Sequence, residues 1–237
     1  MMITILAVAL LGQAQALGQM TYIGTPNTPE SMLILQQDKR LDPPKIGPKD
    51  KLQYEYTVSA LGSSLPDSPG LHPLRFRVFS QVRKAQNDPA AQVARLSLRL
   101  WKYVFERLKL DHSKVYNNQV VDIYLSWGGV AGGEQLFTED IENDRPRKVN
   151  VIYVYDIASF TDPVEMTREI THEYGHAILP PVGGFKAPED WGNGQLGEKL
   201  FMRWLRDDLK AARLAPIDVM CATVSGIDGW VKKNVDP

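Results

Sequence analysis

Residues 162–181 read DPVEMTREITHEYGHAILPP, and this stretch decides how the second half of the chain folds. It opens with Asp162, a residue type that caps helix N-termini, and Pro163, which suits the first helical turn. A glutamate three residues after the cap completes the start signal. The two prolines that close the stretch cannot continue a helix. The sequence therefore predicts a helix that begins at Pro163 and ends near Leu179.

Four titratable side chains share one face of this predicted helix. Glu169, His172, Glu173 and His176 stand at positions i, i+3, i+4 and i+7. Two histidines one turn apart can direct their imidazoles at a common point, as a zinc ion requires. The intervening glutamate can accept a proton from a metal-bound water. The pattern predicts one zinc ion on His172 and His176, with Glu173 as general base. The alternative is a solvated polar helix face that matches by accident.

A third protein ligand is expected from the chain that follows. Residues 194–214 have the periodicity of a second helix, and Glu198 falls within its apolar side. A carboxylate in an apolar setting needs a partner, and zinc would supply one. The alternatives are an ion pair with a buried arginine and a partly exposed position at the helix start. Glu189 and Asp190, in the preceding loop, are rival ligands.

The remaining patterns predict an α+β protein. Strand-like alternation covers residues 74–79, 120–127 and 150–156, and helical spacing covers residues 88–108. We expect a zincin-like domain over residues 71–237, in which a small mixed sheet packs on a long helix, followed by the motif helix and a ligand-bearing helix. Residues 17–70 are rich in proline and are expected to form an irregular arm with two short strand-like pieces, 31–37 and 54–60. Residues 128–133, GGVAGG, lack the lysine of a phosphate-binding loop and are expected to form a flexible loop.

The first residues resemble an export signal. An apolar run over residues 3–11 precedes the small-residue pattern Ala14-Gln15-Ala16, which predicts a signal peptide over residues 1–16, cleaved near Ala16. The protein would then be secreted or periplasmic, without a membrane span after cleavage. A buried N-terminal segment is the alternative. The lone cysteine, Cys221, excludes an intramolecular disulfide and is expected to be a buried thiol.

Charge is nearly balanced, with 27 Lys+Arg against 28 Asp+Glu and a formal net charge of -1. No long run of one sign occurs. The sequence therefore carries no electrostatic footprint for nucleic acid, and none is expected as a partner. Composition does not set the oligomeric state.

The motif His172-Glu173-Tyr174-Gly175-His176, followed by Gly197-Glu198-Lys199-Leu200-Phe201, resembles the gluzincin branch of zinc metallopeptidases. The resemblance implies zinc ligands His172, His176 and Glu198, with Glu173 as general base. It also implies a peptide or protein substrate that pairs with the edge strand before the motif helix, for which residues 150–156 are the candidate.

Two departures from that family favour a second hypothesis. Met202 replaces an acid that commonly orients a ligating histidine, for which Glu169 could substitute. No histidine follows His176 and no tyrosine follows Tyr174, so the usual transition-state stabiliser is missing. Three residues could lend a donor in its place: Arg203, Trp191 and Tyr153. The alternative to an enzyme is a secreted binding or structural module that keeps zinc for stability.

Overall fold

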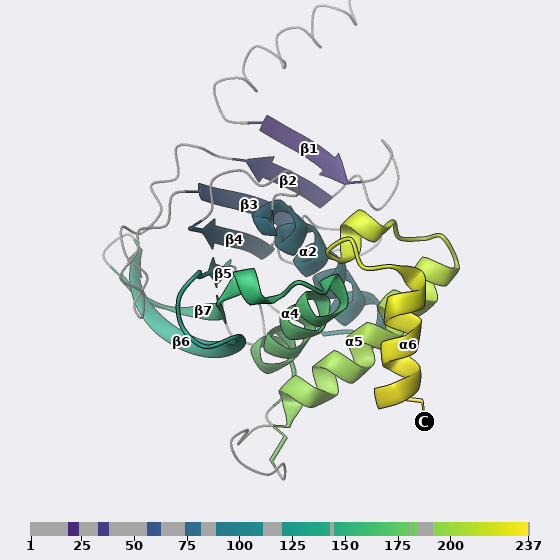
Figure 1. Cartoon of the computed structure of the whole chain (residues 1–237). Helices are drawn as coiled ribbons and strands as arrows, with labels where there is room; N and C mark the ends of the chain where they lie inside the picture. Colours follow the sequence, from purple (N-terminus) through teal and green to yellow (C-terminus); the bar gives the residue numbers. More distant parts are fainter. Residues whose placement is uncertain are drawn as a thin grey trace, which may run out of the picture.

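The computed structural model of the chain describes residues 19–23, 33–37, 56–62, 74–81, 89–110, 120–142, 145–180, 182–183 and 192–236. These residues form an α+β structure with one seven-stranded mixed sheet and four α-helices (Figure 1). In the described part of the chain, no helix is both long and apolar enough to cross a membrane.

The sheet runs in the spatial order β1-β2-β3-β4-β5-β7-β6. Its strands are β1 (Gln19–Ile23), β2 (Leu33–Gln37), β3 (Tyr56–Gly62), β4 (Leu74–Ser80), β5 (Val120–Leu125), β6 (Gly132–Glu142) and β7 (Arg145–Tyr155). Strands β4, β5 and β7 are parallel to one another, whereas the other neighbouring strands are antiparallel. Strand β6 is therefore an edge strand of the described sheet, and β7 returns antiparallel along it.

Four helices follow the early strands along the chain: α2 (Pro89–Leu108), α4 (Pro163–Ile178), α5 (Asn193–Lys210) and α6 (Val224–Asn234). A short 3₁₀ turn, η2 (Ile157–Ser159), lies between β7 and α4, and a second, η3 (Pro216–Val219), lies between α5 and α6. The predicted start of the motif helix is confirmed, because the Asp162 side chain accepts a hydrogen bond of 2.8 Å from Val164 N. The predicted long helix over residues 88–108 is confirmed as α2.

The two faces of the sheet bury different side chains, as the period of two along a strand requires. Val78, Ile123 and Ile152 face the helices and join the main core. On the other face, Phe79, Tyr124 and Tyr153 form a row of stacked rings, with centroids 4.8 and 4.9 Å apart. All four α-helices contribute to the main core, so they cover one face of the sheet.

A buried carboxylate joins α2 to α5. Asp208 accepts hydrogen bonds from Tyr103 Oη at 2.6 Å and from Arg107 and Arg213. Burial raises the pKa of Asp208, but the hydrogen bonds from Tyr103 and Arg213 outweigh it, and the net pKa lies below the ordinary value. Burial of the Tyr103 hydroxyl and its hydrogen bond to Asp208 raise the pKa of Tyr103.

The sheet extends into the region expected to be an irregular arm. Strands β1, β2 and β3 all lie within residues 17–70, and β3 pairs antiparallel with β4. The two strand-like pieces predicted there, residues 31–37 and 54–60, coincide with β2 and β3. The sheet thus crosses the boundary placed at residue 70. Residues 1–16, the predicted signal peptide, lie outside the described residues.

Two local expectations about the sheet are wrong. Residues 150–156 are not an edge strand, because β7 pairs with β5 on one side and with β6 on the other. The glycine-rich stretch 128–133 is not entirely a loop, because Gly132 and Gly133 open strand β6 and pair with Tyr155 and Val154. A strand that starts on two glycines has little hydrophobic alternation to identify it.

Cys221 is exposed, so the prediction of a buried thiol is wrong. Its neighbours Val219, Met220 and Ala222 are buried, as the apolar context suggested. Met220 and Cys221 both have left-handed backbone, with φ of 55° and 63°. These two residues turn the chain after η3, and the turn leaves the thiol at the surface.

Candidate metal centre

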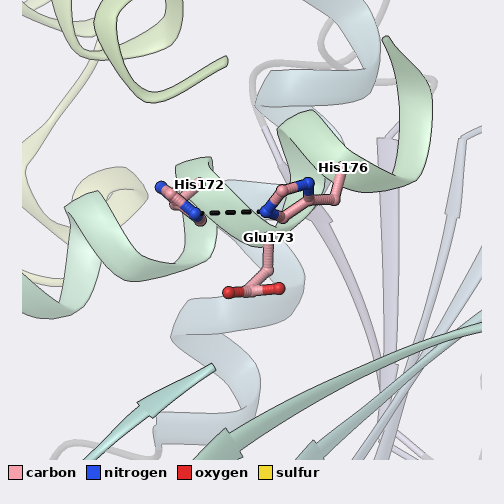
Figure 2. Close-up of side chains that lie close together, drawn as sticks. All are labelled: His172, Glu173 and His176. Atoms are coloured by element: carbon pink, nitrogen blue, oxygen red, sulfur yellow. Dashed lines mark hydrogen bonds between the residues drawn. The ribbon is translucent and has the colours of Figure 1, made fainter. Parts of the chain in front are cut away.

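Three side chains of helix α4 bring their ligand atoms together. His172, Glu173 and His176 each offer one such atom, and these atoms lie within 4.8 Å of one another. The two histidines are one turn apart, and their Nε2 atoms are separated by 3.2 Å (Figure 2). The two histidines predicted as ligands are therefore brought together with Glu173, the predicted base, and these three residues could hold a metal ion.

Helix α5 holds the outer nitrogen of each imidazole. His172 Nδ1 lies 2.9 Å from Glu198 Oε2, and His176 Nδ1 lies 2.8 Å from Asn193 Oδ1. The Asn193 amide is oriented by its own donor, Nδ2, which reaches the Leu179 carbonyl at 3.1 Å. Since a carboxylate and an amide oxygen only accept hydrogen bonds, both Nδ1 atoms must carry the proton. In the neutral form of each ring, Nε2 would then be the acceptor that a metal ion could bind.

The spacing of these two acceptors fits a shared metal ion. Lone pairs that face each other across 3.2 Å repel unless a cation or a proton lies between them. Two nitrogens bound to one tetrahedral zinc ion at about 2.0 to 2.1 Å stand about 3.3 Å apart. Outer acceptors of this kind fix the tautomer that a ligating histidine needs. The spacing and the outer partners of His172 and His176 are therefore compatible with a bound metal ion.

Glu173 lies between the helix and the edge strand of the sheet. Its side chain is almost fully buried, with an exposed fraction of 3%. A Cβ atom built on Gly133 of β6 would lie 2.5 Å from Glu173 Cγ and 2.6 Å from its Oε1. The carboxylate therefore rests directly against the backbone of the edge strand, in a space that a larger residue at position 133 would fill.

Buried amides fix the end of α4 over the sheet. Asn150 on β7 is fully buried, and its Nδ2 donates to the Ala177 carbonyl at 3.0 Å. Gln135 on β6 donates to Asn150 Oδ1 at 2.8 Å. A carbonyl in the last turn of a helix has no partner within the helix, so this contact satisfies it. The contact holds the turn that carries His176 in place above β6 and β7.

An arginine balances the acids beside the histidines. Arg168 pairs with Glu165 at 3.0 Å, with Glu198 at 3.2 Å and with the buried Glu169. Burial lowers the pKa of the Arg168 guanidinium, but Glu169, Glu165 and Glu198 raise it more, so the net pKa lies above the ordinary value. Arg168 therefore stays charged and holds the Glu198 carboxylate beside His172.

Helices α4 and α5 touch through their backbones near the histidines. A Cβ atom on Gly175 would lie 2.7 Å from the Asn193 carbonyl and 2.9 Å from Gly197 Cα. A Cβ atom on Gly197 would lie 2.5 Å from Gly175 Cα. The backbones of the two helices therefore pack closely at Gly175, where only a glycine fits. This crossing brings Asn193 and Glu198 within reach of the imidazoles.

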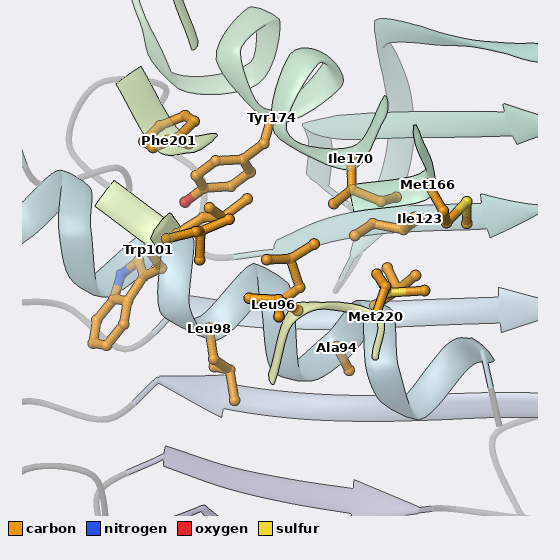
Figure 3. Close-up of a cluster of buried hydrophobic side chains, with 14 of the residues drawn as sticks. Ala94, Leu96, Leu98, Trp101, Ile123, Met166, Ile170, Tyr174, Phe201 and Met220 are labelled. Carbon is orange, nitrogen blue, oxygen red and sulfur yellow. The ribbon is translucent and has the colours of Figure 1, made fainter. Parts of the chain in front are cut away.

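The opposite side of α4 anchors the motif in the core. Tyr174 is fully buried between Phe76 and Phe201, with ring centroids 6.0 and 5.8 Å away. Figure 3 shows Tyr174, Ile170 and Met166 pointing into the apolar cluster of the sheet and α2. Burial raises the pKa of the Tyr174 hydroxyl well above its ordinary value. The helix thus presents its apolar side to the core and its titratable side to β6 and α5.

The other predicted site residues lie elsewhere. Glu198 faces the outer nitrogen of His172 rather than the Nε2 pair, so its role as a ligand stays a prediction. Glu169, the suggested orienting acid, pairs with Arg168. Arg203 pairs with Asp236 near the C-terminus, and Tyr153 belongs to the aromatic row on the far face of the sheet. Three candidates lie outside the described residues: Glu189, Asp190 and Trp191.

Sequence reasoning missed Asn193 and the two glycines that border the site. Asn193 is the first residue of α5, and an amide at a helix start is normally assigned to capping. Gly133 and Gly194 have no reactive side chain. They are identified as part of the site only because a Cβ atom at either position would clash with a motif side chain. The recurrence Gly-x-x-Gly at 194 and 197 is a sequence signal of a close helix approach.

Comparisons with protein-family models, with curated proteins and with solved structures find no match to this chain.

Proposed function

We propose that the chain is an exported, zinc-dependent hydrolase that cleaves peptide bonds and has a zincin-like fold. The observation that carries this proposal is the pair of Nε2 atoms, 3.2 Å apart, whose outer nitrogens are both committed to acceptors. Such outer partners are usual for metal-ligating histidines, and they favour the proposal over an accidental match of the motif on a polar helix face.

His172 and His176 would hold the zinc ion, which, when bound, supplies a Lewis acid and lowers the pKa of a bound water. Glu173 occupies the position of the proton acceptor, since it follows His172 on the same face of α4 and is buried against β6. Burial removes competing water from around this carboxylate. The role of Glu173 is therefore to take the proton and return it to the leaving amine.

The edge strand offers a place for the substrate. Strand β6 ends the described sheet next to Glu173, so its outer backbone groups have no neighbouring strand within the described sheet. An extended peptide can add to such an edge through main-chain hydrogen bonds. The first part of β6, near Gly133, is thus the candidate strand for pairing with the substrate, in place of residues 150–156, which the family resemblance had implied.

One observation favours a secreted module that keeps zinc without turnover. Two of the suggested donors for transition-state stabilisation, Arg203 and Tyr153, are engaged away from the histidines. Export itself is proposed from residues 1–16 alone. The two functions differ in a measurable way, because both bind zinc and just one hydrolyses peptides.

The proposal is tested by incubating the zinc-loaded chain with a library of unmodified peptides and following cleavage by mass spectrometry. We expect new peptide termini that disappear after chelation and return when zinc is restored. A chelated sample with magnesium added serves as the control for metal identity. Stoichiometric zinc without any zinc-dependent cleavage would support the non-catalytic module instead.

A further inference from the structure

We infer that helix α5 supplies no metal ligand and instead orients both ligating histidines from behind, through Glu198 and Asn193, while the Gly194 backbone closes the site. This inference rests on the proposed zinc centre and deepens it. It assigns Glu198 the role of a positioning residue, which differs from the ligand role that the family resemblance implies. It also implies that the site requires glycine at position 194, because any side chain there would enter the space beside both imidazoles.

The contacts of Glu198 carry the first step. Its Oε2 lies 2.9 Å from His172 Nδ1 and 3.2 Å from Arg168 Nη1. The two nitrogens of an imidazole ring point in diverging directions, so an acceptor on Nδ1 lies on the far side of the ring from a metal on Nε2. One carboxylate oxygen with these two donors is already placed as an outer partner. Glu198 therefore sets the ring orientation and the tautomer of His172.

Asn193 plays the matching part for His176. Its Oδ1 lies 2.8 Å from His176 Nδ1, and its Nδ2 bonds the Leu179 carbonyl at 3.1 Å. The side chain is buried, with an exposed fraction of 4%. The first turn of α5 thus contacts His176 through the Asn193 amide, and the next turn contacts His172 through the Glu198 carboxylate.

Between these two residues, the backbone of α5 comes directly against the ligand nitrogens. A Cβ atom built on Gly194 would lie 2.3 Å from His176 Nε2 and 2.6 Å from His172 Nε2. These distances are close to a zinc–nitrogen bond of about 2.0 to 2.1 Å, so a methyl group at position 194 would compete for the space of the ion. A metal-ligating side chain at position 194 is excluded for the same reason, because its Cβ and further atoms would have to fit in the space of the ion.

The close approach is fixed by the helix crossing and not by the histidines alone. Gly175 packs directly against Gly197 and the Asn193 carbonyl, so no side chain lies between the two helix backbones at this point. The distance between α4 and α5 is therefore set by backbone contact. Helix α5 cannot retreat without breaking these contacts and the bonds from Glu198 and Asn193. Position 194 is therefore held at the metal side of both imidazoles.

The inference is tested with zinc and cobalt(II) titrations of the full chain, measured by calorimetry and by the visible spectrum of bound cobalt. Outer partners of metal ligands typically change affinity by about 10- to 100-fold. We expect Glu198→Leu to weaken zinc binding within that range and Glu198→Gln, which keeps an acceptor, to weaken it about 10-fold or less. The cobalt bands of Glu198→Gln should match those of the wild type, because the ligand set is unchanged.

Position 194 provides the second arm of the experiment. Gly194→Ala should weaken zinc binding by more than about 100-fold, since a methyl group enters the space beside both nitrogens. The matched control is Gly229→Ala in α6, where an added Cβ atom meets nothing within 4 Å, and this variant should bind zinc like the wild type. Far-ultraviolet circular dichroism of each variant separates loss of binding from loss of fold.

Two results would overturn the inference while leaving the zinc centre in place. One is a Glu198→Gln variant with shifted cobalt bands, which would make Glu198 a ligand. The other is a folded Gly194→Ala variant with wild-type affinity. Absence of zinc binding in the wild type would instead remove the proposed function on which the inference rests.

Discussion

Glu173→Gln is expected to lower kcat/KM for the best peptide substrate by about 10²- to 10⁴-fold while zinc stays bound, since general-base catalysis is typically worth that factor. Glutamine has nearly the same shape and keeps the contact with Gly133, but its amide cannot accept a proton from water. The loss should appear in kcat rather than KM, because the carboxylate acts in the chemical step. Steady-state kinetics and zinc analysis of the same sample give both quantities.

Glu165→Gln is the matched control for this substitution. Glu165 lies on the first turn of the same helix, is exposed, and pairs with Arg168 at 3.0 Å. Removing an exposed pair of this kind changes little, so activity should stay within about twofold of the wild type. Equal activity of Glu173→Gln and the wild type would remove Glu173 from the role of base.

Asp208→Ala is expected to lower the free energy of unfolding by about 3 kcal/mol, near the lower end of the range for breaking a buried ion pair. The substitution leaves the buried Tyr103 hydroxyl without its 2.6 Å acceptor and removes the Asp208 hydrogen bonds that join α2 to α5. Arg107 and Arg213 are partly exposed and can recover water, which places the cost at the lower end. Urea unfolding at neutral pH measures the change.

The effect of Asp208 should also depend on pH. The folded pKa is lowered from the ordinary value of 3.8, so the contribution of this carboxylate is fully present above that value. It is lost as the pH falls through the folded pKa. The difference in stability between the wild type and Asp208→Ala should therefore be constant near neutral pH and shrink below about pH 4. Asp228→Ala, which removes ion pairs with the exposed Lys210 and Lys232, is the control and should change the unfolding midpoint little.

The sequence predicts the elements that carry strong local signals. The start of α4 follows from an N-cap acid and a first-turn proline, and both are used as expected in the structure. The one-turn spacing of His172 and His176 predicts a shared face, and their nitrogens do meet. Helix α2 follows from its apolar spacing, because that spacing is what buries it against the sheet. These features depend on neighbours within a few residues along the chain.

Features that depend on distant contacts could not be predicted in the same way. Strand β6 begins with Gly132-Gly133 and continues through polar residues, so no hydrophobic alternation marks it as the edge of the sheet. In the proline-rich region before residue 70, local patterns indicated β2 and β3, but they predicted neither β1 nor the antiparallel pairing of these strands with one another and with β4. A helical projection placed Glu198 within the apolar side of its helix, but it could not say that the carboxylate would face His172 or which ring nitrogen it would contact.

Zinc content per chain tests the central claim most directly. The full-length wild type, His172→Ala, His176→Ala and, as a control for loss of a histidine, His112→Ala would be prepared with zinc in excess and analysed by elemental mass spectrometry after gel filtration. We predict about one zinc per chain in the wild type and in His112→Ala, and a loss of zinc in both motif variants. Zinc-free wild type, or zinc retained at the wild-type level without His172 or His176, would contradict the metal centre.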